Sequence, residues 1–178
     1  MQYLSKKDVR ELLDELRSRP YIDKSLIDYV QEFEDDVKKV WEEEKFEIIV
    51  FGSFPTLFKS KKMDSYTITL YAVNVMYNTK GVLVVPAVVV DEGAVPYIKK
   101  GADVMLPGIR RVAKPFMKGD VVAVLEPSEK YAIALGVALV DSATIVPGAK
   151  GKGIKNVNYL DDDIWRACLQ IAKVFQRR

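Results

Sequence analysis

The first apolar pattern along the chain predicts a helix over residues 5–19. Apolar residues recur at intervals of three and four, as on one face of a helix: Val9, Leu12, Leu13 and Leu16. Ser5 precedes this run and is a suitable N-cap, because its hydroxyl oxygen can accept a hydrogen bond from a backbone N–H. Pro20 follows the run and is expected to end the helix.

A longer run over residues 24–44 has a similar periodicity and predicts a second helix. Its apolar side consists of Leu26, Ile27, Val30, Phe33, Val37, Val40 and Trp41. Its other side is acidic and ends in the glutamates at 42–44, which we interpret as a solvated face. A metal site on these carboxylates is the alternative interpretation.

The period of the pattern then changes to that of strands. Three segments are rich in β-branched and aromatic residues: 45–52, 56–60 and 66–73. The segment 71–78 fits either a strand or a short helix, and the segment 79–86 fits a turn followed by a strand. Residues 1–86 are therefore expected to form two helices and a small sheet.

From residue 87 onward the pattern is one of short strands separated by turn signals. The expected strands are 87–91, 102–108, 118–126, 131–141 and 151–162. A short helix over 92–101 should end at Gly101, and Gly136 inside its strand indicates a bulge or a barrel corner. A last helix is expected over 161–176.

Five or six short strands with one inserted helix favour a small closed or nearly closed barrel. We therefore expect an α+β protein with two domains. Residues 1–86 would form the N-terminal domain, and residues 87–178 would form the barrel together with the C-terminal helix. The length of 178 residues, nearly half of them hydrophobic, suffices for one domain or two small ones.

Charge distinguishes the two halves weakly. Residues 1–86 carry 13 basic and 15 acidic side chains, a net charge of −2, whereas residues 87–178 carry 14 and 10, a net charge of +4. The basic excess lies in the second half, which makes that half the better candidate to meet a polyanion.

Missing residue types exclude several kinds of site. The chain has no histidine, which excludes Ser-His-Asp and Cys-His catalysis and histidine-ligated zinc. Its single cysteine, Cys168, excludes an internal disulfide, and its apolar helical surroundings favour a buried thiol over a reactive one. No metal or cofactor is expected. The longest apolar run, residues 82–90, is too short to span a bilayer, so we expect a cytoplasmic protein.

Two segments of the second half carry a resemblance. Residues 90–109, "VDEGAVPYIKKGADVMLPGI", resemble the opening of a PUA domain, an RNA-binding module named for pseudouridine synthases and archaeosine transglycosylases. The end of the chain is similar to that of one subgroup, the malignant T-cell amplified sequence proteins and the corresponding part of ligatin. The residues in register with that ending are Gly151, Gly153, Ile154, Asn156, Tyr159, Leu160, Asp162 and Trp165. The chain departs from it at Asn158, where histidine is usual.

The resemblance implies an RNA surface on the short helix and the following strand, with the last strand beside them. The implied contact residues are Lys99, Lys100, Gly101, Pro107, Gly108, Arg110, Arg111, Lys150, Lys152, Lys155, Asn156 and Asn158. The cations would hold phosphates, the glycines and the proline would set the shape of the surface, and the two asparagines would hydrogen-bond sugar or base.

Structural interpretations of the same residues stay open. Pro107-Gly108 is also a common turn signal, and each lysine is also compatible with an ordinary solvated surface. Asn156 also suits a structural turn, and Trp165 suits a core position better than a stacking platform. A phosphate loop is excluded, because the glycine-rich segment 148–153 matches neither the P-loop nor the dinucleotide pattern.

The subgroup resemblance implies a non-catalytic RNA-binding protein of translation. Such a protein docks on the small ribosomal subunit and influences initiator tRNA placement, reinitiation or recycling, with a translation factor as a possible protein partner. The alternative is an accessory subunit that targets tRNA or rRNA to an RNA-modifying enzyme. A catalytic role for this chain ranks third, because no acid–base pair is visible in the sequence.

Overall fold

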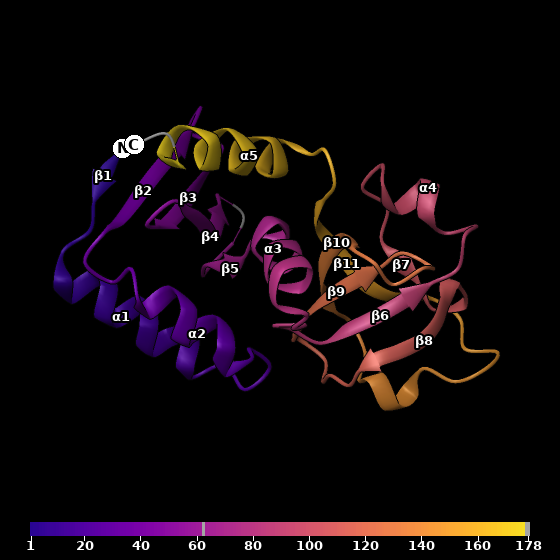
Figure 1. Cartoon of the computed structure of the whole chain (residues 1–178). Helices are drawn as coiled ribbons and strands as arrows, with labels where there is room; N and C mark the ends of the chain where they lie inside the picture. The colour runs from indigo at the N-terminus through magenta and orange to yellow at the C-terminus, as the bar shows by residue number, and fades with distance from the viewer. Residues whose placement is uncertain (62, 177–178) are drawn as a thin grey trace.

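The computed structural model describes residues 1–61 and 63–176, which form two sheets and the helices around them (Figure 1). The first sheet has the strand order β1-β2-β3-β4-β5. Its strands are β1 (Gln2–Tyr3), β2 (Val37–Glu42), β3 (Phe46–Phe51), β4 (Phe54–Ser60) and β5 (Thr67–Ile68).

The second sheet has the order β7-β11-β10-β9-β6-β8, and β6 and β9 form its one parallel pair among the described strands. Its strands are β6 (Ala87–Val90), β7 (Val104–Met105), β8 (Ile109–Lys114), β9 (Val121–Leu125), β10 (Ala132–Ala138) and β11 (Lys152–Tyr159). The helices are α1 (Lys6–Arg17), α2 (Lys24–Gln31), α3 (Leu70–Lys80), α4 (Val95–Ile98) and α5 (Asp163–Gln176), with 3-10 turns η1 (Leu106–Gly108) and η2 (Ser142–Thr144). The mixed fold class predicted from the sequence is confirmed.

The first predicted helix is confirmed and the second is too long. The Ser5 hydroxyl accepts a hydrogen bond from the backbone N–H of Asp8 at 3.1 Å and caps α1. Helix α2 ends at Gln31, and residues 37–42, predicted as helix, form strand β2 paired with β3. The glutamates at 43 and 44 lie in the hairpin loop with positive φ angles of 45° and 58°.

The ambiguous segment 71–78 belongs to helix α3. The Thr69 hydroxyl caps its start by accepting the Ala72 N–H at 3.0 Å, and Gly81 ends it with a φ of 68°. The strand predicted within 79–86 is absent. Val84 and Val85 are buried in a segment that belongs to neither sheet, and β6 begins at Ala87.

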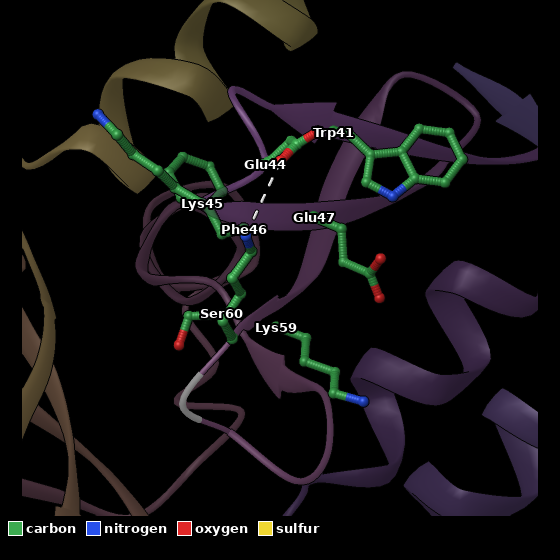
Figure 2. Close-up of a pocket in the computed structure, with 8 residues that line it drawn as sticks. Trp41, Glu44, Lys45, Phe46, Glu47, Lys59 and Ser60 are labelled. Atoms are coloured by element: carbon green, nitrogen blue, oxygen red, sulfur yellow. Dashed lines mark ion pairs between the residues drawn. The ribbon is translucent and has the colours of Figure 1, made fainter.

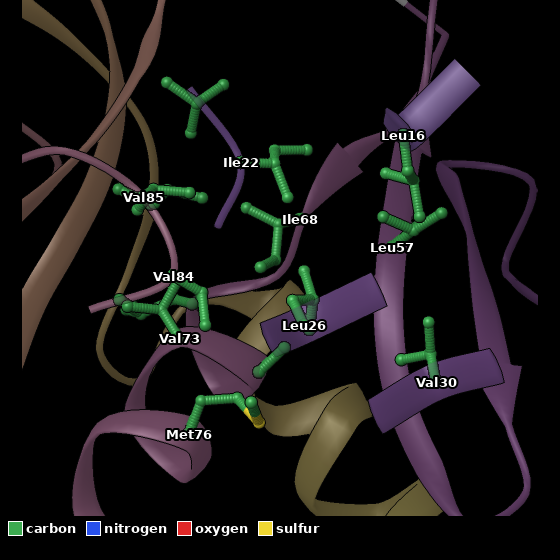
Figure 3. Packing of buried hydrophobic residues seen from close by; sticks show 14 of the residues in the cluster. Leu16, Ile22, Leu26, Val30, Leu57, Ile68, Val73, Met76, Val84 and Val85 are labelled. Carbon is green, nitrogen blue, oxygen red and sulfur yellow. The ribbon is translucent and has the colours of Figure 1, made fainter. Parts of the chain in front are cut away.

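One continuous apolar core joins the two sheets. It contains residues of α1, α2 and α3, the inner face of the first sheet, and residues of β6, β9 and β10. Figure 3 shows side chains of α1, α2, β4, α3 and the 84–85 segment converging on this interior.

Helix α5 packs on the first sheet although it follows the second in sequence. Ala167, Cys168 and Ile171 lie against Ile48 and Val50 of β3 and the neighbouring strand β4. The sequence-based division placed this helix with the barrel, whereas its buried face belongs to the N-terminal sheet. Cys168 is fully buried, as predicted, and this burial raises the pKa of its thiol. No helix in the described part of the chain is long and apolar enough to cross a membrane.

Candidate nucleic-acid interface

A hollow of about 550 Å³ lies between helix α4 and the segment β7–η1. Its lining includes Tyr97, Met105, Pro107, Gly108 and Lys152. Tyr97 is 69% exposed and Met105 is 46% exposed, so both offer apolar surface to solvent. An aromatic ring beside a backbone with few bulky side chains can accept a planar group such as a nucleobase.

Glycines allow the backbone segments around this hollow to approach one another closely. A Cβ atom at Gly108 would lie 3.2 Å from the Cβ of Ala94, and the Gly108 carbonyl accepts the Asp91 N–H at 3.0 Å. Pro107-Gly108 therefore forms a tight turn and also lines the hollow. Gly101 ends the turn after α4 with a φ of 97°, as the sequence predicted.

The last strand runs beside this surface, as expected from the sequence. Lys152 pairs with Met105 and Ile154 with Val104 in the β11–β7 ladder. A Cβ atom at Gly153 would lie 2.8 Å from the Leu106 side chain, so glycine at this position lets β11 lie close to η1.

One of the predicted lysines, Lys152, lines the hollow, and two others follow a lining residue in sequence. Lys99 and Lys100 are exposed and directly follow the last residue of α4, which lines it. The Lys152 ammonium pairs with Asp103 at 3.2 Å, and its side chain is 62% exposed. Lys150 and Lys155 are exposed on the same last segment but do not line the hollow.

Arg110 and Arg111, at the start of β8, contact another loop of the chain. The Arg110 guanidinium donates a hydrogen bond to the Pro127 carbonyl at 2.8 Å, and Arg111 pairs with Glu129. Both partners lie in the loop between β9 and β10, whereas Lys99 and Lys100 follow helix α4.

Asn156 holds the end of helix α4, and both N–H groups of its side chain are engaged within the protein. Its side-chain amide donates to the carbonyls of Ile98 and Ala102 at 3.1 and 3.0 Å, while its backbone N–H donates to Asp103 at 3.0 Å. Its carboxamide oxygen is buried without a hydrogen-bond partner in the described residues. Asn156 thus orients the helix that carries Tyr97, Lys99 and Lys100.

Asn158 is fully buried and cannot reach a ligand at the surface. Its carboxamide oxygen accepts the Leu70 N–H at 2.8 Å, and its amide donates to the Asp162 carboxylate at 3.0 Å. Burial raises the pKa of Asp162, opposed by hydrogen bonds from the backbone of Trp165 and Tyr159. This asparagine therefore joins strand β11 to helix α3, and the prediction of a sugar or base contact is wrong.

Sequence reasoning missed Tyr97 and Met105 as surface residues of this site. The signal for Tyr97 was present: Val95 and Ile98 face inward on one side of the short helix, which turns Pro96 and Tyr97 outward. Trp165, expected in the core, is partly buried with its ring centre 6.1 Å from that of Tyr71. Within the described residues, no three acidic or cysteine side chains lie close enough to hold a metal ion.

Comparison with known proteins places this architecture in a family. Residues 86–160 match the PUA domain. The chain is 34% identical over 163 residues to an uncharacterized protein of Methanocaldococcus jannaschii, covering 92% of this chain and 93% of that one. It is 31% identical over 134 residues to malignant T-cell-amplified sequence 2 of Mus musculus, covering 74% and 71% of the two chains.

Solved structures agree with these sequence matches. A hypothetical protein from Pyrococcus horikoshii OT3 superposes with a TM-score of 0.76 at 28% identity, covering 94% of this chain and 98% of that one. A PUA-domain protein from Aeropyrum pernix K1 superposes with a TM-score of 0.75 at 27% identity, covering 96% and 91%. PUA domains bind RNA, so the match supports RNA binding by this chain. The chain belongs to the malignant T-cell-amplified sequence family of PUA-domain proteins.

Proposed function

We propose that this chain is a non-catalytic RNA-binding protein of translation that docks on the small ribosomal subunit and influences initiator tRNA placement, reinitiation or recycling. Its relatives among the malignant T-cell-amplified sequence proteins support the family context. The observation that carries the RNA contact is the hollow between α4 and β7–η1, which is lined by the exposed Tyr97 and by Lys152.

The contact surface is proposed to work by shape and charge. Lys99, Lys100 and Lys152 would hold phosphates and fix the register of the RNA without reading its sequence. Tyr97 would stack against an unpaired base. Pro107 has a small side chain and Gly108 has none, so both leave space for that base in the hollow. No bond is made or broken in this scheme, so the protein acts by occupying a place on its RNA.

The first unit, residues 1–86, has a different role in this proposal. We propose that residues 87–160 supply the RNA surface and that residues 1–86, with helix α5 packed on their sheet, present a surface to the ribosome or to a translation-factor partner. Action on ribosomes would place the protein in the cytoplasm.

The test is binding of the full chain to purified small ribosomal subunits and to bulk tRNA, by sedimentation and by anisotropy, over a series of salt concentrations. The variant Lys99→Ala/Lys100→Ala should bind more weakly, with a salt slope lower by about 1 for each phosphate that is no longer bound. The matched control Lys6→Ala/Lys7→Ala removes the same charge from exposed positions on α1 and should bind bulk tRNA like the wild type.

A preference for the ribosomal particle would support the translation role. A preference for tRNA would instead favour the targeting of an RNA-modifying enzyme. If the Lys99/Lys100 variant and the Lys6/Lys7 control lose affinity equally, the hollow beside α4 is not the RNA contact.

A further inference from the structure

A second hollow lies on the first unit, across strands β2, β3 and β4. It has a volume of about 640 Å³, and its lining includes Lys61. Trp41, Phe46 and Lys59, which also line it, are labelled in Figure 2. These residues take no part in the candidate interface described above. In Figure 1, β2 and α4 lie at opposite ends of the molecule.

Trp41 is the most exposed residue of strand β2. Val37, on the same face of β2, is buried under α1 and α2, whereas the Trp41 side chain lies beyond this cover and is 46% exposed. Its position is fixed by the ladder, in which Trp41 pairs with Glu47 of β3. A large apolar ring held rigidly toward solvent suits a binding surface.

Ammonium groups and aromatic rings alternate beside Trp41. The Lys39 ammonium lies 5.9 Å from the centre of the Trp41 ring and 6.0 Å from that of Tyr66, and the Lys59 ammonium lies 5.8 Å from Tyr66. These contacts hold positive charge next to flat apolar surface.

The acidic residues of this hollow are already engaged or weakly paired. The Tyr66 hydroxyl donates to Glu47, which also lies 3.9 Å from the Lys39 ammonium. Glu44 lies 4.0 Å from Lys61, with both side chains largely exposed, so an incoming phosphate can displace this contact. Lys59 forms no ion pair with any described residue. Its ammonium lies beside the Tyr66 ring, so its charge is not neutralised by a carboxylate and can bind a phosphate.

We infer that this hollow is a second RNA contact, which takes an unpaired nucleotide with its base on Trp41 and its phosphate against Lys59 and Lys61. Aromatic rings combined with a cationic rim are how proteins hold single strands without reading sequence. An acidic peptide would neutralise the charge of the lysines, but it would place no planar group on the Trp41 ring. The inference rests on the proposed RNA-binding function and adds a site outside the barrel.

The experiment uses Trp41 as its own reporter. Trp165→Phe leaves Trp41 as the only tryptophan in the chain, and this variant is titrated with a uridine oligonucleotide of about twelve residues, a length within the range one single-strand site covers. Tryptophan fluorescence and anisotropy of the labelled RNA are recorded together. If Trp165→Phe does not fold, the same signal is obtained as the difference between the wild type and Trp41→Phe.

We expect Trp41 fluorescence to be quenched with the same midpoint as the anisotropy change. Trp41→Ala should weaken binding by about 5- to 100-fold, the effect typical of removing one stacked base. Lys59→Gln should lower the salt slope by about 0.7, the value for one phosphate on a single strand. The control Lys7→Gln, on an exposed residue of α1, should change neither quantity.

Three results overturn the inference. RNA binding with unchanged Trp41 fluorescence and full affinity in Trp41→Ala would exclude this hollow and leave the proposed function intact. No RNA binding by either readout would exclude both. Equal quenching by poly-glutamate would identify the hollow as a contact for acidic protein segments.

Discussion

The carboxamide oxygen of Asn158 accepts a hydrogen bond from the backbone N–H of Leu70 at 2.8 Å, although 88 residues separate them in the chain. Leu70 is the first residue of α3, and Asn158 belongs to β11, so this bond ties a helix of the first unit to a strand of the second. The same side chain donates to Asp162, whose carboxylate accepts the Trp165 N–H at the start of α5. The buried side chain of Asn158 thus connects the N-terminal ends of α3 and α5.

Asn158→Ala should therefore destabilise the protein without touching the RNA surface. The change leaves the buried Leu70 N–H without its partner, so we expect the free energy of unfolding to fall by about 2–3 kcal/mol. Urea unfolding measures this decrease. The control Lys155→Ala, on an exposed residue of the same strand, should stay within about 0.5 kcal/mol of the wild type. Weaker RNA binding by folded Asn158→Ala would show that this residue has a role in binding after all.

Glu126 should make stability depend on pH in the acidic range. Burial raises the pKa of its carboxyl, but hydrogen bonds from the side chain and N–H of Ser128 and from the Lys130 N–H outweigh this effect and hold the pKa below its ordinary value. A carboxyl with a lowered pKa in the folded state stabilises the protein above its unfolded pKa, and this contribution is lost as pH falls through the folded pKa.

The variant Glu126→Gln tests this linkage. At about pH 7 it should be less stable than the wild type by about 1–2 kcal/mol, and the difference should shrink as the pH falls through the lowered pKa of the folded state. Denaturant unfolding of both proteins across this range measures the gap. A gap that is constant with pH would mean that the carboxylate charge contributes nothing and that only the shape of the side chain matters.

The helices and strands that the sequence mispredicted have identifiable physical causes. Lys38 occupies a buried position of β2, with its ammonium 2.7 Å from Asp36 and 4.5 Å from the centre of the Phe175 ring. A polar residue on the inner side of a strand hides the alternation of period two, so residues 37–42 matched a helical pattern instead. Helix α3 is buried on several sides between the sheets, which removes the one-sided pattern of a surface helix.

The candidate site was predictable where it depends on local signals. Gly101, Pro107 and Gly108 shape short turns, and their positions followed from the sequence. Asn156 and Asn158 were assigned to the surface because their partners are distant in sequence: Asn156 bonds the carbonyl of Ile98, 58 residues away, and Asn158 bonds Leu70. Only the tertiary structure shows that these amides are already occupied.

Gly136 confirms the bulge that the sequence indicated and should tolerate no side chain. The β10–β11 register shifts between Leu135 and Gly136, and a Cβ atom at Gly136 would lie 2.4 Å from the Lys155 carbonyl oxygen. Because the obstacle is backbone, Gly136→Ala should cost about 3 kcal/mol or prevent folding. Gly93→Ala is the control, since its Cβ would meet no atom closer than 3.5 Å, and it should fold normally. Thermal unfolding compares the two, and equal stability would contradict the close approach of the strands.

Variants of Tyr97 and Lys100 distinguish base stacking from phosphate binding at the hollow beside α4. Its ring is 69% exposed on α4, so Tyr97→Ala removes aromatic surface without opening the core. We expect affinity for RNA to fall by about 1–3 kcal/mol while the salt slope stays unchanged, because the same phosphates remain bound.

Lys100→Ala, three residues away, should show the opposite pattern, with a lower slope and a smaller decrease in affinity at high salt. Anisotropy titrations of both variants over a salt series measure slope and affinity together. Tyr97→Phe controls for the hydroxyl and should bind like the wild type, since the ring face is kept. If Tyr97→Ala instead lowers the slope as Lys100→Ala does, the ring acts only by positioning the neighbouring lysines, and the hollow holds phosphate and no base.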